Sequence, residues 1–128
     1  MEKIVMIDGK EVRMRASALI PRLYRFKFGR DMVSDMRQLE KQYRKIKNLP
    51  KEATEEEKRD AQLSVTDLTI FENVAYLFVK HADPQNVPDT PEEWLDNLDG
   101  VFDVYQVLPT VMEMWKHNMG QTSTLKKN

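Results

Sequence analysis

Cysteine is absent from this 128-residue chain, which excludes disulfide bonds and thiolate chemistry. Glycine is scarce: the four glycines stand far apart, at positions 9, 29, 100 and 120, so they form no glycine-rich phosphate-binding loop. No run of apolar residues approaches the roughly eighteen that a membrane-spanning helix needs, and the N-terminus lacks a signal-peptide pattern. We therefore expect a protein without a membrane segment, and the lack of cysteine is compatible with a cytoplasmic, reducing location.

Groups that could perform catalysis are also few. His81 and His117 are the only histidines, and they fall on different predicted helices without a metal-binding spacing. Glu92, Glu93 and Asp96 form a carboxylate cluster, but capping and the helix dipole explain acidic residues in the first turns of a helix. No serine has a histidine neighbour in sequence, although such groups also assemble in space. We therefore expect no enzyme activity, no cofactor and no metal site.

Composition indicates one globular domain, because 41% of the residues are hydrophobic and 32% are charged. Residues 1–118 form the predicted domain. Residues 119–128 are polar and show no apolar periodicity, so they are predicted to be a flexible tail. The charge is polarised: residues 1–51 hold fourteen Lys and Arg against six Asp and Glu, whereas residues 52–128 hold six against fifteen. We favour an arrangement in which the basic and the acidic half fold together, so that their electrostatic fields partly cancel. A nucleic-acid partner for the basic half, or contacts between different copies or partners, are the alternatives.

The first residues predict a β-hairpin. Asp8-Gly9 separates two runs with β character, and a type I′ turn requires positive φ at both of these positions. Val12 and Met14 share one face of the second strand, so this face should pack on helices.

The remaining chain predicts helices. Ser17 should cap a first helix that ends before Gly29, and a second begins near Asp31. Thr54 opens a capping box, after which a helix continues to Ala82 or is interrupted near Ser64. Two more helices are predicted, a short one from Thr90-Pro91 and a last one over residues 100–118. The predicted fold is α+β and mainly helical, with an N-terminal β-hairpin packed on about five helices and a disordered C-terminal tail.

Aromatic and basic residues alternate densely in the block Pro21–Asp31. Cations and aromatic rings together would suit single-stranded nucleic acid. We favour core packing, with Leu23 and Phe26 in a buried stripe and Arg22 and Arg25 extending around it.

The last predicted helix carries methionines and a tryptophan, which can form an adaptable groove for a partner helix. Alternatively, Met112 and Trp115 close the core, and the sequence leaves both interpretations open. The candidate partner-binding residues are Tyr105, Met112, Trp115, Met119, Lys126 and Lys127.

The blocks Pro21–Asp31 and Asp83–Leu95, in this order behind the hairpin, resemble the tail assembly chaperones of long-tailed, siphovirus-like phages and prophages of Gram-positive bacteria. The likeness extends from the hairpin to about Trp115. It implies a non-catalytic protein that keeps the long helical tape measure protein soluble in the host cytoplasm and helps to recruit tail tube subunits. It also implies absence from the mature virion, and it supplies no residue-level catalytic motif.

Leu125-Lys126-Lys127 can be encoded by a nucleotide run on which ribosomes slip into the −1 frame. Within the resembled family, such slippage gives a longer product with a domain that contacts the tail tube protein. Two alternative functions remain: a structural tail component, such as a tube or completion protein that self-associates into rings, and a less favoured nucleic-acid-binding regulator that uses the basic half.

Overall fold

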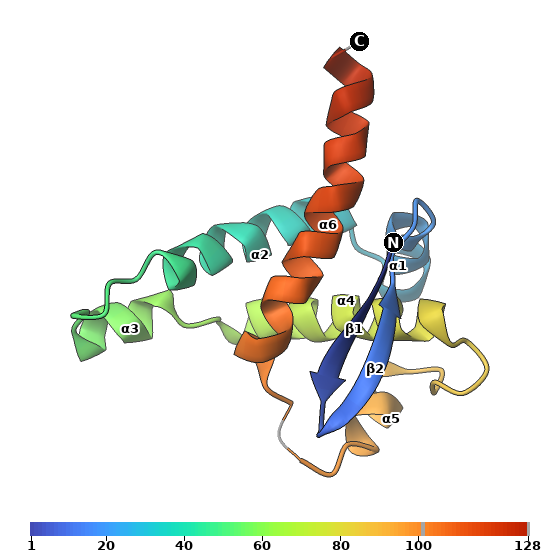
Figure 1. Cartoon of the computed structure of the whole chain (residues 1–128), viewed down its shortest axis with the longest axis horizontal. Coiled ribbons are helices and arrows are strands. Elements are labelled where there is room, and N and C mark those ends of the chain that lie inside the picture. Colours follow the sequence, from blue (N-terminus) through green and yellow to red (C-terminus); the bar gives the residue numbers. More distant parts are fainter. Residues whose placement is uncertain (101, 128) are drawn as a thin grey trace.

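The computed structural model describes the backbone of residues 1–100 and 102–127, and side chains in these ranges as far as residue 117 (Figure 1). In this part of the chain, a two-stranded antiparallel hairpin is followed by six helices. The predicted α+β, mainly helical fold is therefore confirmed.

The hairpin consists of β1 (Glu2–Ile7) and β2 (Lys10–Arg15). Asp8 and Gly9 have φ values of 57° and 73°, which are the two positive values that a type I′ turn requires. Met14 is fully buried and Val12 is half-buried, so the predicted inner face of β2 is correct. The Asp8 carboxylate accepts a hydrogen bond from the Asp99 backbone N–H at 2.8 Å, which fixes the turn to a segment far along the chain.

Helices α1 (Ile20–Phe28) and α2 (Met32–Lys47) follow the hairpin. Ser17 was expected to be the N-cap of α1, but the N-cap is Leu19, and Ser17 accepts a hydrogen bond from the Leu19 N–H at 3.3 Å ahead of the helix. Gly29 ends α1 with a left-handed φ of 66°, and its N–H donates to the Arg25 carbonyl. The two helices therefore meet at a sharp, glycine-dependent corner.

Helices α3 (Glu55–Ala61) and α4 (Val65–Ala82) resolve a question that the sequence left open. Thr54 forms the predicted capping box with Glu57, and Ser64 forms a second one with Asp67. The second capping box starts a new helix, so the chain is interrupted near Ser64 rather than continuous to Ala82.

Helix α5 (Pro91–Asp96) begins as predicted, with Thr90 accepting a hydrogen bond from the Glu93 N–H at 3.1 Å. Helix α6 (Val104–Lys127) begins later than predicted, because the Asp103 carboxylate accepts hydrogen bonds from the first free N–H groups of this helix. Its backbone continues to Lys127, beyond the predicted end at residue 118. The side chains of the tail expected over 119–128 lie outside the described part, so its flexibility stays a prediction.

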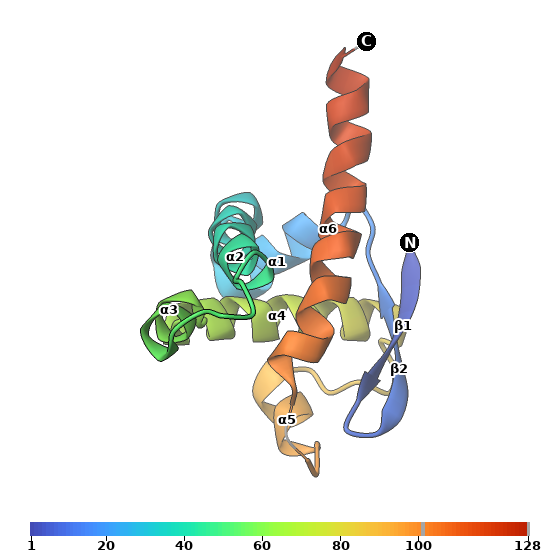
Figure 2. The same cartoon turned by 60° about the vertical axis from the view of Figure 1, so that its left-hand side comes forward.

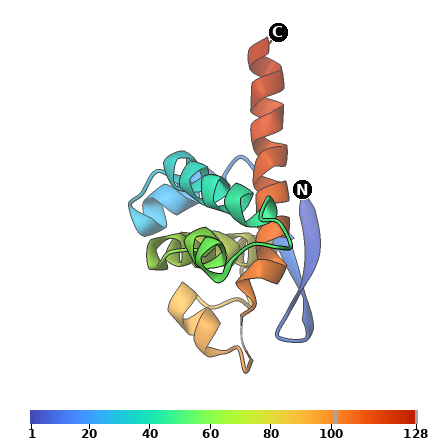
Figure 3. The ribbon, with the colours of Figure 1, turned by 90° about the vertical axis from the view of Figure 1, so that its left-hand side faces the viewer.

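Helix α4 is the centre of the molecule. The helices α1 and α2 lie along one side of it, α5 lies on the opposite side, and α6 crosses it next to the hairpin (Figures 1, 2 and 3). Tyr76 of α4 contacts Trp94 of α5, which in turn makes an edge-to-face contact with Phe102 at a ring distance of 5.4 Å. Because α4 is covered on several sides, its apolar residues occur all around the helix. None of the helices in the described ranges has the length and apolarity to cross a membrane.

Candidate partner-binding surface

Of the residues predicted to bind a partner, those with described side chains do not form one surface. Met112 and Trp115 are only 1% and 5% exposed, so they close the core, which is the alternative that the sequence left open. Tyr105 is 49% exposed. Met119, Lys126 and Lys127 have side chains outside the described part of the chain. Of the predicted set, the described side chains therefore leave Tyr105 alone as an accessible large residue.

Tyr105 borders a shallow hollow of about 250 Å³ between α2, α3 and the start of α6. Half-buried Ile46 and Leu49 and buried Ala61 provide its apolar wall. This hollow could hold a single apolar side chain, and Met112 and Trp115, with which Tyr105 was expected to act, do not line it.

Phe26 of α1 corrects the prediction of a buried aromatic stripe. It is 71% exposed, whereas Tyr24 is fully buried. Helical residues are about 100° apart, so Ile20, Tyr24 and Phe28 follow each other on one face, and Phe26 lies about 200° from Tyr24. The four-residue spacing of Tyr24 and Phe28 in the sequence could have identified the inner face of the helix. In the structure their ring centroids are 5.1 Å apart.

Phe26 stands at the edge of an apolar groove between α1, α4 and the segment that follows α4. The groove has a volume of about 450 Å³. We call it the Phe26 groove, and its lining residues are Leu23, Phe26, Lys27, Tyr76, Leu77, Lys80 and Asp89. The guanidinium carbons of Arg22 and Arg25 lie over the Phe26 ring, at 5.2 and 6.0 Å from its centroid. An exposed aromatic ring is thus held in a cationic environment.

The far wall of the groove is fixed by hydrogen bonds. Tyr76 donates its hydroxyl to the Pro88 carbonyl at 2.5 Å, and burial raises the pKa of Tyr76 to about 12, with smaller contributions from neighbouring carboxylates. Lys80 donates to the Val87 carbonyl at 2.7 Å and pairs with the Asp89 carboxylate at 3.1 Å. These bonds hold the segment after α4 against the helix, so the groove is preformed.

The position of α1 depends on a buried carboxylate in α2. Asp35 is 4% exposed and accepts two hydrogen bonds from the Arg30 guanidinium, at 2.7 and 2.8 Å, and one from the Tyr24 hydroxyl at 2.6 Å. The Arg30 hydrogen bond lowers the pKa of Asp35, whereas burial and the Asp35 hydrogen bond raise the pKa of Tyr24. This triad joins both ends of the α1–α2 corner, so Tyr24 and Arg30 of the block Pro21–Asp31 have a structural role, whereas Phe26 is exposed.

Ser17 and His81, far apart in sequence, meet in the structure. The Ser17 Oγ lies 2.9 Å from His81 Nε2, which is the distance of a nucleophile–base pair. Burial lowers the pKa of His81, with a contribution from the positive charge of Arg15. Among the described residues no carboxylate is bonded to the His81 ring, so the pair lacks the third group that orients a catalytic histidine. Its evident effect is to join the segment before α1 to the end of α4.

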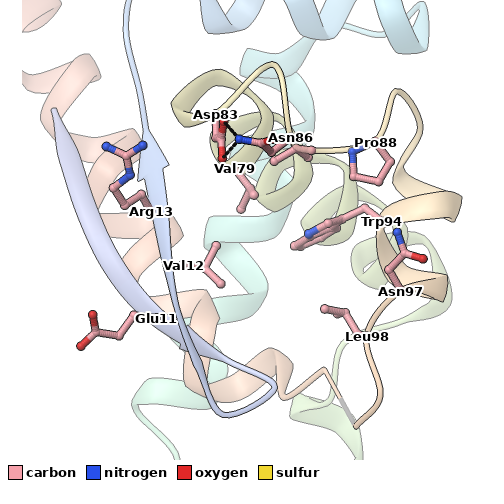
Figure 4. Close-up of a pocket in the computed structure, with 11 residues that line it drawn as sticks. Glu11, Val12, Arg13, Val79, Asp83, Asn86, Pro88, Trp94, Asn97 and Leu98 are labelled. Carbon is pink, nitrogen blue, oxygen red and sulfur yellow. Dashed lines mark hydrogen bonds between the residues drawn. The ribbon is translucent and has the colours of Figure 1, made fainter.

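A third hollow, of about 380 Å³, lies between β2, the end of α4 and α5 (Figure 4). Val12, Val79, Trp94 and Leu98 point into the space between the hairpin and α5, whereas Glu11 points away from it. Asp83 is engaged by the Asn86 side chain at 3.0 Å. Apolar side chains from the hairpin, α4 and α5 therefore face this cavity, and the charged residues Arg13 and Asp83 also line it.

No group of three or more potential metal ligands occurs within the described residues. The chain matches no protein-family model, no curated protein and no solved structure.

Proposed function

We propose that this chain is a tail assembly chaperone of a long-tailed phage or prophage, which binds the tape measure protein and keeps it soluble during tail morphogenesis. The observation that carries the proposal is the Phe26 groove, a preformed apolar groove with an exposed aromatic residue at its edge. Leu23, Phe26 and Lys27 of its lining belong to the block Pro21–Asp31, and Asp89 belongs to the block Asp83–Leu95. These are the two blocks that resemble the family, and α4 supplies the other lining residues.

The properties of the groove suit a chaperone for a long helical client. A free helical chain exposes apolar stripes that aggregate unless they are covered. A groove with an apolar floor and a charged rim can cover one stretch of such a stripe reversibly. Many copies along one client would then give tight overall binding from modest individual affinities.

The proposal includes the cellular setting of the family. The protein would act in the cytoplasm of the bacterial host and would be absent from the mature virion. A −1 frameshift near Lys126 and Lys127 would give a longer form that recruits tail tube subunits.

Co-expression with a tape measure protein of the same phage or prophage tests the proposal. We expect the tape measure protein to be soluble, and to co-purify with this chain, only when both are expressed together. An unrelated acidic helical protein of similar size, expressed in place of this chain, is the control. A tape measure protein that stays insoluble and unbound in the presence of this chain would refute the proposal.

One observation favours a second candidate function. The prediction against nucleic acid depended partly on burial of the aromatic residues, but Phe26 is exposed between Arg22 and Arg25. A nucleic-acid-binding regulator would bind single-stranded DNA or RNA with a steep dependence on salt concentration. A mobility-shift titration of this chain with a single-stranded oligonucleotide at two salt concentrations tests it.

A further inference from the structure

We propose that the Phe26 groove binds an amphipathic helix whose apolar stripe is flanked by carboxylates. This inference rests on the proposed function, because it specifies the type of client segment that the chaperone would bind. It also replaces the predicted α6 surface with a site formed by α1 and α4.

The apolar part of the site requires a large apolar partner side chain. Phe26 is 71% exposed, and half-buried Leu23 and buried Leu77 continue the apolar surface from α1 to α4. A partner helix would place residues at spacings of three and four into such a groove. Exposed aromatic anchors next to a pocket contribute strongly to binding, because they lose water contact on all sides when the partner covers them.

The positive charges at the edge of the groove determine which residues are favoured beside the apolar stripe of the partner helix. Arg22 and Arg25 make no ion pair with any described residue, and α1 contains no acidic residue. The carboxylate in the lining, Asp89, is already paired with Lys80. Two unpaired guanidinium groups beside an apolar groove favour a partner that brings carboxylates, and they disfavour a basic one.

Nucleic acid fits the same site less well. Proteins that bind single strands offer successive aromatic rings on which bases stack. Here Phe26 is the exposed ring, with two guanidinium groups already over it, while Tyr76 of the groove is fully buried and bonded to Pro88. The apolar side chains of Leu23 and Leu77 in the lining also favour a protein helix over a charged backbone.

Fluorescence anisotropy with two designed, labelled peptides tests the inference. Both peptides form amphipathic helices with the same leucine stripe, and one carries glutamates beside the stripe where the other carries lysines. We expect the full-length protein to bind the glutamate peptide at least about tenfold more tightly than the lysine peptide. Equal binding of both peptides, or a preference for the lysine peptide, would overturn the inference.

Variants then locate the site. Phe26→Ala should weaken binding of the glutamate peptide about tenfold or more, since it removes the exposed aromatic anchor. Arg22→Glu with Arg25→Glu should reverse the preference, so that the lysine peptide binds more tightly. Circular dichroism of each variant should be unchanged, because these side chains are exposed.

Matched controls exist elsewhere on the surface. Tyr105→Ala removes another exposed aromatic side chain, and Arg37→Glu with Lys41→Glu reverses two exposed charges of α2 outside the groove. We expect less than a twofold effect from either control. Loss of binding in Tyr105→Ala with retention in Phe26→Ala would overturn the inference and place the client at the start of α6. Tighter binding of single-stranded poly(dT) than of the glutamate peptide, lost in Phe26→Ala, would overturn it in favour of nucleic acid.

The same variants separate this inference from the proposed function. If the unaltered chain solubilises the tape measure protein and Phe26→Ala does so equally well, the function stands and the site is wrong. If the unaltered chain binds the glutamate peptide through Phe26 but does not solubilise the tape measure protein, the site stands and the function is wrong.

Discussion

Replacing Asp35 by asparagine should destabilise the protein strongly for a single, nearly isosteric change. Asp35 is 4% exposed and accepts three hydrogen bonds of 2.6–2.8 Å from Arg30 and Tyr24. An asparagine oxygen in the place of Asp35 Oδ2 can still accept from the Tyr24 hydroxyl and from Arg30 Nε, but the NH2 group in the place of Oδ1 would then face Arg30 Nη2. The asparagine side chain also carries no charge to pair with the guanidinium.

The expected loss in the free energy of unfolding is about 2–3 kcal/mol. Breaking a fully buried ion pair costs more, about 3–5 kcal/mol. The lower figure applies because the Arg30 side chain is 53% exposed and can regain water when its partner is lost. Tyr24→Phe removes only the third hydrogen bond and should cost about 1 kcal/mol.

Urea unfolding monitored by tryptophan fluorescence measures these values, since Trp94 and Trp115 are 6% and 5% exposed in the folded protein and become exposed on unfolding. The exposed Asp96→Asn in α5 is the matched control and should change the free energy of unfolding by less than about 0.5 kcal/mol. A loss below about 0.5 kcal/mol for Asp35→Asn would refute the structural role of the triad.

The pH dependence of the same difference provides an independent check. The folded protein lowers the pKa of Asp35 below its ordinary value of 3.8. The unfolded chain then binds more protons than the folded one just below that value, so the stabilisation is fully present above it and is lost as pH falls through the lowered pKa. The difference between the unaltered protein and Asp35→Asn should therefore be constant from neutral pH to about pH 5 and decrease at lower pH.

Three further predictions concern the core and the corners of the fold. Gly29→Ala should lower the free energy of unfolding by about 1 kcal/mol in urea unfolding, because Gly29 has a φ of 66°; no loss would mean that α1 ends differently. Trp115→Ala should lower it by about 3–5 kcal/mol because this side chain is 5% exposed, and a fully stable variant would contradict its place in the core. Burial lowers the pKa of His81 in the folded protein below its ordinary value of 6.5. The unfolded chain therefore binds a proton at His81 more readily, so the free energy of unfolding decreases as pH falls below 6.5. His81→Gln should remove this decrease between pH 7.5 and 5.5, and an equal decrease in both proteins would contradict the assignment.

Local elements of the fold were predictable because their signals lie within a few residues. The Asp8-Gly9 turn, the Thr54 capping box and the start of α5 at Thr90-Pro91 were all predicted and are all confirmed. Each depends on hydrogen bonds or backbone angles between residues at most three or four positions apart. The second capping box at Ser64 was equally local, but the apolar residues that continue after it left the interruption undecided.

The candidate site was less predictable. Tyr105 was correctly expected to be accessible, but Met112 and Trp115 are buried because α6 crosses α4 next to the hairpin, a packing that periodicity alone does not reveal. The sequence placed Phe26 in the core because a short helix with many aromatic residues is compatible with more than one buried face. The outcome depended on which face of α1 the other elements cover.

By itself, the amino-acid sequence determined the kinds of elements, most of their ends and the mainly helical α+β fold, since turns, caps and apolar spacing act over short distances. The tertiary structure decided which side chains remain accessible. The Tyr24–Arg30–Asp35 triad joins α1 to α2 through buried hydrogen bonds, and this orientation directs Tyr24 inward and Phe26 outward. The exposure of a side chain depends on which neighbouring elements cover it. The Phe26 groove, which extends from α1 to α4, therefore exists only in the folded molecule.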